Sequence, residues 1–174
     1  APLFSFAGKG ISETDEELMK KLVTANDQLV TGLLNSIQEN KLSFSRRTAT
    51  DFAVLSGSYC EKRSAYYHDT RLVSKLEILA RFLTASQGED GTVNVGNLES
   101  PPDTAFVIEI VSTATASLQQ QQQPALKGVL DQIKIMIRKA GEALRTGGIH
   151  TPNHRWVICA ALSQANTLYP DKKY

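Results

Sequence analysis

The segment that decides the fold covers residues 100–118 and reads Ser100-Pro-Pro-Asp-Thr-Ala-Phe-Val-Ile-Glu-Ile-Val-Ser-Thr-Ala-Thr-Ala-Ser-Leu118. Ser100 and the two prolines predict a helix start, because proline suits the first turn of a helix. From Ala105 to Ala116 the only charged residue is Glu109. A helix with so little charge is expected to be buried on most of its circumference.

Two other segments repeat this pattern. Asp51 and Asn153 are predicted near the starts of low-charge helices, 52 residues before and 50 residues after Asp103. Amphipathic helices are predicted between them, from about Glu13 to Glu39, from Asp69, and from Pro124, with starts about 56 residues apart. A period of about 50 residues that contains two helices indicates stacked helical hairpins.

The alternation predicts the layers. The low-charge helices form an inner layer, and the amphipathic helices surround them. We therefore predict an all-α fold, a single domain over residues 1–174 with about three antiparallel hairpins, which is the N-terminal part of a larger α/α-toroid. All inner helices then begin on one rim, where Asp51, Asp103 and residues 150–155 meet.

Composition narrows the function classes. The net charge is +1, with 19 basic and 18 acidic side chains spread along the chain, so no basic stripe suggests nucleic-acid binding. No apolar run has the length of a membrane span. The opening Ala1-Pro2 without methionine fits a mature end after export, and an engineered start equally well. Cys60 and Cys159 lie on apolar helical faces and are interpreted as buried free thiols.

The richest chemistry lies in residues 149–156, Ile149-His-Thr-Pro-Asn-His-Arg-Trp156. A helix N-terminus attracts negative charge through its N–H groups and its dipole. Asn153 can donate a hydrogen bond to a carboxylate, and His154 can act as an acid or base near neutral pH. His150 and Arg155 are candidates for binding an anionic substrate.

Each of these residues also has a purely structural interpretation. Asn153 is a good N-cap, Arg155 can pair with a rim carboxylate, and Trp156 suits the core as well as a sugar-stacking platform. Asp103 can simply be a first-turn acid. His150 and His154 do not share a helical face, because Pro152 separates them, so no metal site is predicted. No cofactor-binding fingerprint is present either.

Four motifs resemble a known family. They are Gln87-x-Glu-Asp-Gly-Thr, Ser100-Pro-Pro-Asp-Thr-Ala-Phe-Val-Ile-Glu109, Gly147-Gly-Ile-His-Thr-Pro-Asn-His-Arg-Trp156 and Leu168-Tyr-Pro-Asp-Lys-Lys-Tyr174. Together they are similar to the N-terminal half of bacterial exported proteins of the heparinase II/III-like class, over about residues 60–174. The resemblance implies an α/α-toroid catalytic domain and a secreted or periplasmic location.

The resemblance also implies an activity. In the related uronate lyases an Asn–His pair at an inner-helix start neutralises the uronate carboxylate and takes part in proton abstraction, and Asn153-His154 matches that pair. The tyrosine that acts beside it comes from a later hairpin and has no matching position here. The expected partner is an acidic polysaccharide or oligosaccharide.

Functions other than lyase activity remain open. One is a glycoside hydrolase that uses Asp51, Asp103 or Glu109 as carboxylic acids. Another is a non-catalytic module that binds glycan or protein through the same rim, and a third is a purely structural helical bundle. Inner-helix faces that an open toroid exposes also allow self-association.

Overall fold

The computed structural model describes residues 13–38, 41–42, 45–93, 100–148 and 151–174. The described chain is all-α, and its only β-type pairing is an isolated bridge between Gln87 and Val93. The helices are α1 (Glu13–Ser36), α2 (Ser45–Cys60), α3 (Thr70–Ala85), α4 (Pro101–Gln120), the short 3-10 helix η2 (Pro124–Leu126), α5 (Lys127–Leu144) and α6 (Pro152–Leu168).

Helix starts follow the predicted capping signals in two places. Ser100 is the N-cap of α4, and its hydroxyl oxygen accepts a hydrogen bond from the N–H of Asp103 at 3.3 Å. Asp69 caps α3 in the same way, with a distance of 2.8 Å to the N–H of Arg71. These side chains satisfy N–H groups that the helix itself leaves without a partner.

The predicted limits of the first two helices were wrong. α1 ends at Ser36 instead of Glu39. The spacing of Phe52, Leu55 and Tyr59 predicts a second helix over about residues 49–63, whereas α2 covers Ser45–Cys60. The residues just before Thr48 look like a polar break in the sequence, but Arg47 pairs with Asp51 one turn later at 2.9 Å. This i,i+4 pair supports an earlier helix start.

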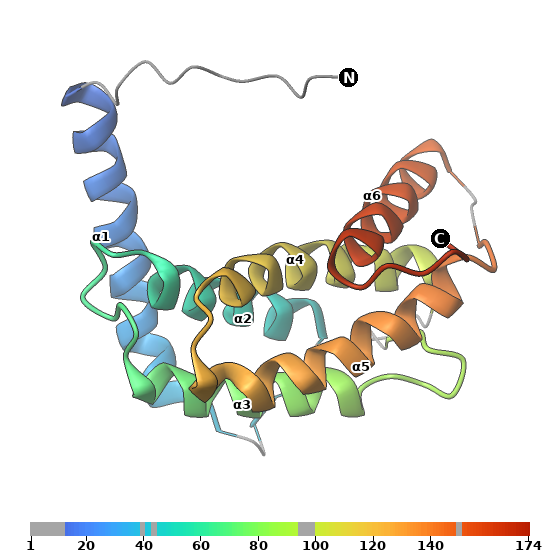
Figure 1. Ribbon diagram of the computed structural model, residues 1–174, viewed down its shortest axis with the longest axis horizontal. Helices are drawn as coiled ribbons and strands as arrows, with labels where there is room; N and C mark the ends of the chain where they lie inside the picture. The colour runs from blue at the N-terminus through green and yellow to red at the C-terminus, as the bar shows by residue number, and fades with distance from the viewer. Residues whose placement is uncertain (1–12, 39–40, 43–44, 94–99, 149–150) are drawn as a thin grey trace.

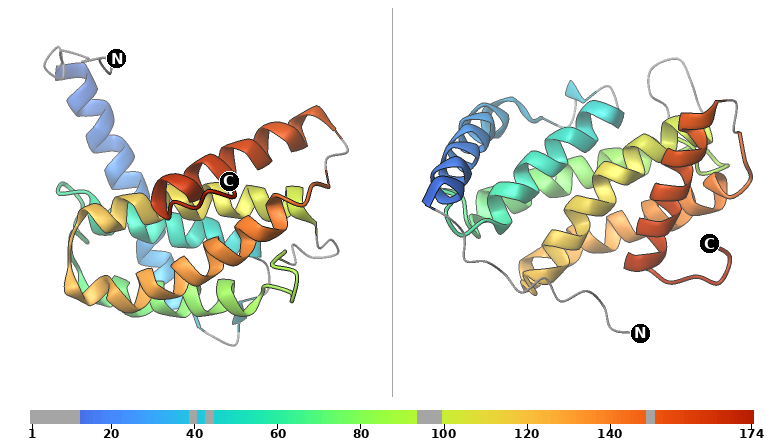
Figure 2. Two further views of the ribbon diagram at one scale, coloured as in Figure 1. Left: turned by 45° about the vertical axis from the view of Figure 1, so that its right-hand side comes forward. Right: turned by 90° about the horizontal axis from the view of Figure 1, so that it is seen from above.

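The helices form two layers (Figures 1 and 2). Seen from above in Figure 2, α2, α4 and α6 lie side by side and run in the same direction. On one side of them lie α3 and α5, which run in the opposite direction. The core is between the layers, and its largest fully buried side chains include Phe52, Leu76, Ile108, Ile133 and Met136.

The first helix departs from this arrangement. α1 lies across the edge of the two layers, packs mainly against α2, and projects beyond the body of the molecule (Figure 1). Only Val30 and Leu33 are buried within it. The predicted place of α1 beside α3 and α5, as an outer helix, is therefore wrong.

The low-charge helices differ in burial. α4 is buried on most of its surface, as predicted, with ten buried residues between Pro102 and Leu118. α6 is not, because it buries only Val157, Ile158, Ala161 and Ala165. Trp156 is 75% exposed, so its interpretation as a core residue was wrong.

The two cysteines differ in exposure. Cys159 is exposed, so its interpretation as a buried thiol was wrong. Cys60 is half-buried, and burial raises the pKa of its thiol to about 11.

Candidate functional site at the start of α6

The first turn of α6 displays polar side chains around an open helix end. Thr151 is the N-cap residue, with an extended backbone, and it makes no side-chain capping bond. The predicted cap, Asn153, instead lies inside the first turn and accepts a hydrogen bond from the Thr151 hydroxyl. Asn153 and Arg155 are exposed, His154 is half-buried, and His150 lies outside the described residues.

This turn can recognise an anion. The N-terminal end of α6 carries the positive end of the helix dipole, and no acidic residue lies in its first turn. The Asn153 amide and the Arg155 guanidinium add donors, and the exposed Trp156 ring supplies a flat apolar surface. The imidazole of His154 is the fourth group of this turn, and an imidazole can accept or donate a proton.

A second polar cluster lies at the start of α4. The Asp103 carboxylate accepts a hydrogen bond from the Ser100 hydroxyl at 2.5 Å and lies 3.9 Å from a guanidinium nitrogen of Arg46 in α2. The same guanidinium lies over the Phe106 ring, 4.9 Å from its centroid. The ends of α2 and α4 are therefore joined by an ion pair and a cation–π contact.

Asp51 is not at a helix start. It is the seventh residue of α2, about 9 Å along the helix axis from Ser45 at 1.5 Å per residue. Its carboxylate is buried and is bound by Arg47 at 2.9 Å. The expectation that Asp51 begins a helix was wrong, because the helix starts further upstream.

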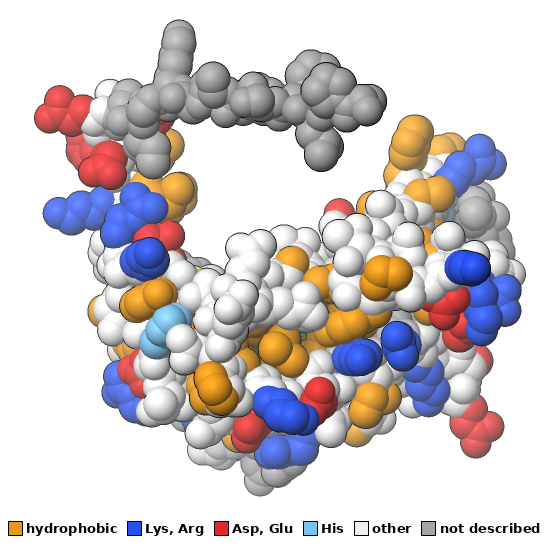
Figure 3. All heavy atoms as spheres, viewed as in Figure 1, with side chains coloured by type: hydrophobic (Ala, Val, Ile, Leu, Met, Phe, Trp, Pro, Cys, Tyr) orange, Lys and Arg blue, Asp and Glu red, His pale blue; other side chains and the backbone are white. Residues whose placement is uncertain are grey.

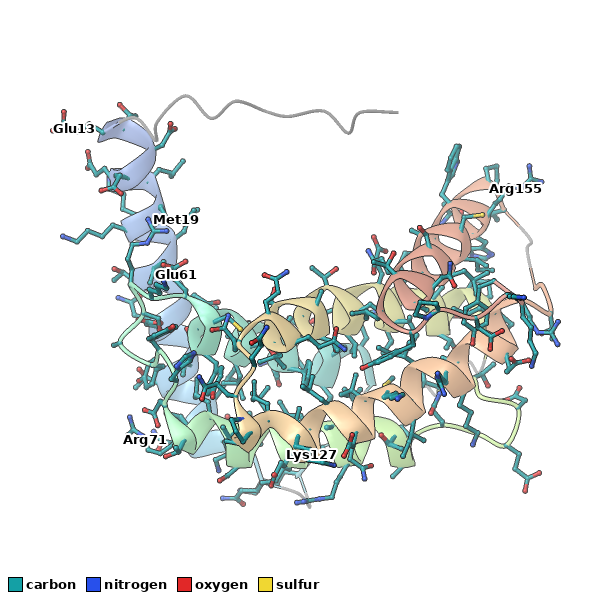
Figure 4. The ribbon with its side chains drawn as sticks, in the orientation of Figure 1. Glu13, Met19, Glu61, Arg71, Lys127 and Arg155 are labelled. Atoms are coloured by element: carbon teal, nitrogen blue, oxygen red, sulfur yellow. The ribbon has the colours of Figure 1, made fainter. Side chains whose placement is uncertain are left out.

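The starts of α2, α4 and α6 nevertheless lie at one end of the molecule (Figure 2). The Arg46–Asp103 pair joins the first two. The turn before α6 lies against the start of α4, since a Cβ added at Gly148 would come within 3.1 Å of the Pro101 ring. α6 begins at its projecting end, where Figure 4 shows Arg155, and runs from there toward α4, against which its later turns pack.

A groove that was not predicted lies between α2 and α4, and we call it the floor groove. It has a volume of about 580 Å³. Its single charged residue is Glu109, and small side chains surround it. The lining residues are Ala53, Ser56, Gly57, Glu109, Ile110, Thr113, Ala114 and Ser117. Their helical spacing of three and four residues is the signal that could have revealed the groove.

A second missed feature joins α1 to the turn after α2. The Asp27 carboxylate accepts hydrogen bonds from the hydroxyls of Ser58 (2.7 Å) and Ser64 (2.6 Å) and from the N–H of Ala65 (2.8 Å). Burial raises the pKa of Asp27, but these hydrogen bonds outweigh it and lower the pKa below 3.8. The network lines a cavity of about 490 Å³ that also contains Lys20 and Arg63.

The described residues contain neither a metal centre nor a membrane-spanning helix. Within residues 13–38, 41–42, 45–93, 100–148 and 151–174 no group of three or more histidine, cysteine or acidic side chains is placed to hold a metal ion. No helix in that part of the chain is long and apolar enough to cross a membrane.

Comparison with protein-family models, with curated proteins and with solved structures finds no match to this chain.

Proposed function

We propose that this protein is polysaccharide lyase-like and acts by β-elimination on uronate-containing glycans. The observation that supports the proposal best is the open N-terminus of α6, where Asn153, His154 and Arg155 stand beside an exposed Trp156. An acidic sugar needs a site for its carboxylate and an apolar surface for its ring, and this turn offers both.

The chemistry assigns a role to each side chain. The Asn153 amide and the α6 N-terminus hold the uronate carboxylate and neutralise its charge, which acidifies the proton on C5. The His154 imidazole then removes that proton, the electron pair forms the C4–C5 double bond, and the C4–O glycosidic bond breaks, with its oxygen taking a proton from water or from the imidazolium. Arg155 and His150 bind neighbouring acidic groups of the glycan, and Trp156 stacks on the sugar. The glycan extends from there past Asp103 and Asp51.

We also propose that the helices α2 to α6 form part of an α/α-toroid. Parallel α2, α4 and α6 beside antiparallel α3 and α5 are what an arc of an α/α-toroid contains. On this view the protein is an exported one, and the common end of α2, α4 and α6 is the mouth of the toroid.

The direct test is incubation of the protein with a panel of uronate glycans while the ultraviolet absorbance of the unsaturated uronate product is followed. We expect absorbance to rise with the native protein, and we expect Asn153→Ala and His154→Ala each to reduce the rate by at least about 100-fold. Thr167→Ala, at the other end of α6, is the control and should keep the rate. Equal rates in all four proteins would contradict the assignment.

A second function is favoured by Glu109, the carboxylic acid of the floor groove. A glycoside hydrolase would release reducing ends without the unsaturated product, and Glu109→Gln would abolish that release. A non-catalytic module would bind the glycan without any product, and Asn153→Ala would weaken that binding.

A further inference from the structure

α1 carries an apolar stripe that nothing in the described chain covers. Leu18, Leu22 and Leu29 are 56%, 56% and 59% exposed and recur at the spacing of one helix face. We call these three residues the α1 stripe. Three large leucines in a row on a projecting helix make an exposed apolar surface of the kind that marks a docking site.

The α1 stripe faces a hollow in the molecule. Figure 3 shows hydrophobic side chains on the side of α1 that looks across this hollow toward α6. Leu22 lines a groove of about 350 Å³ that reaches Gly57 of α2, and Leu29 lines one of about 550 Å³ that reaches Val54. The floor groove between α2 and α4 also contains Gly57, so the grooves adjoin. Stripe and floor groove are thus parts of one concave surface.

The two parts have complementary shapes. The α1 stripe is a ridge of large side chains, whereas the floor groove is lined mainly by glycine, alanine, serine and threonine. In helix packing, side-chain ridges of one helix fit into depressions lined by smaller side chains on the surface opposite. The ridge cannot reach its own molecule's floor groove, because α1 stands at the edge of α2 (Figure 1).

The charges are complementary as well. The first turn of α1 is acidic, with Glu13, Asp15 and Glu16, while the first turn of α2 carries Arg46 and Arg47, which remain partly exposed beside their own carboxylate partners. Lys21 follows at the edge of the α1 stripe, and the floor groove holds Glu109. A helix laid along the floor groove can therefore meet opposite charges at its acidic end and at Lys21.

We propose that two copies of this chain associate through their hollows about a twofold axis, with the α1 stripe of each copy in the floor groove of the other. Both halves of the contact are present in one chain, so a twofold arrangement satisfies both at once. This association does not depend on the glycan chemistry proposed above.

The first test is the molar mass in solution, measured by light scattering during size exclusion and by sedimentation. We expect about twice the chain mass of 19.1 kDa. Leu22→Glu on the ridge and Thr113→Arg on the floor should each raise the dimer dissociation constant at least about tenfold, since each places a charge in the apolar contact. Ile135→Glu changes an equally exposed residue on α5 and should leave the dimer intact.

All three changed residues are exposed, so the variants should keep the native circular dichroism, which is recorded in parallel. A native protein that remains monomeric up to its solubility limit would overturn the proposal. A dimer that persists in Thr113→Arg would also overturn it, because the floor groove would then not be part of the interface.

A crosslinking experiment tests the pairing itself. Leu22→Cys and Thr113→Cys are made as separate proteins in a Cys159→Ser background and are then mixed under mild oxidation. We expect a disulfide-linked dimer only in the mixture. Crosslinking of Leu22→Cys with itself, and no disulfide between the two different variants in the mixture, would mean that two α1 helices pack on each other and would refute the proposed geometry.

Discussion

At the scale of single residues, Asp27 contributes most clearly to holding α1 on the body. Its carboxylate gathers three donors, two of them the buried hydroxyls of Ser58 and Ser64. We predict that Asp27→Ala lowers the free energy of unfolding by about 1–3 kcal/mol, because it leaves those hydroxyls without their acceptor. Denaturant titration measures the change, and Gln28→Ala, at an exposed neighbour, should change it by no more than about 0.5 kcal/mol.

The same residue predicts a pH dependence. The pKa of Asp27 in the folded protein lies below its ordinary value of 3.8, so its contribution to stability is complete above that value. The contribution is lost as the pH falls through the lower folded pKa. Thermal unfolding of native protein and Asp27→Asn from pH 7 to pH 2 should therefore show a gap in melting temperature that narrows below about pH 4. A constant gap would count against this network.

At the scale of elements, two glycines allow a matched comparison. Gly91 has a φ of +90°, and a Cβ there would collide with the carbonyl group of Lys139 in α5. Gly32 is inside α1, and a Cβ there would meet nothing within 4 Å. We predict that Gly91→Ala lowers the melting temperature and costs more than about 1 kcal/mol, whereas Gly32→Ala raises stability by about 0.5–1 kcal/mol. Equal effects would show that the turn before Val93 is not held against α5.

The sequence predicts elements well where capping chemistry and apolar spacing agree. Ser100 and Asp69 fix the starts of α4 and α3, and the low charge of α4 indicates its burial. The same reasoning failed for α6. This helix has few charged residues, but several of its uncharged residues are polar, namely Ser163, Gln164, Asn166 and Thr167. These side chains are uncharged but polar, so they tolerate the solvent that reaches the outer face of the helix.

The position of α1 was beyond sequence reasoning for a different reason. Its leucines recur at helical spacing all the way from Leu18 to Leu33, and periodicity alone gives one continuous buried face. In the structure the burial begins only at Val30, because α1 crosses α2 instead of lying along it. Crossing geometry depends on tertiary packing, which a helical period does not contain.

For the candidate site, residue types were easier to predict than distances. Asn153, His154, Arg155 and Trp156 do lie together in one helical turn, since they are adjacent in the sequence. The relation of that turn to Asp51 required the true start of α2, and the arginines that bind Asp51 and Asp103 are recognisable only from the packed helices.

At the scale of the whole molecule, α1 and α6 stand on either side of the hollow (Figures 1 and 3). α2, α4 and α6 begin at the same end, so a glycan bound at the start of α6 would extend toward Asp103 and Arg46. The hollow itself is available to a second copy. The proposed glycan site and the proposed self-association surface are therefore different parts of one concave face.

The central claim is that the first turn of α6 binds an acidic glycan, and the fluorescence of Trp156 tests it most directly. Trp156 is the only tryptophan in the chain and is 75% exposed within that turn. We predict that an oligouronate shifts its emission to shorter wavelength in a saturable way, that a neutral oligosaccharide of equal length does not, and that Asn153→Ala with Arg155→Ala abolishes the shift. An emission spectrum that no acidic glycan changes, or that neutral and acidic glycans change equally, would contradict the claim.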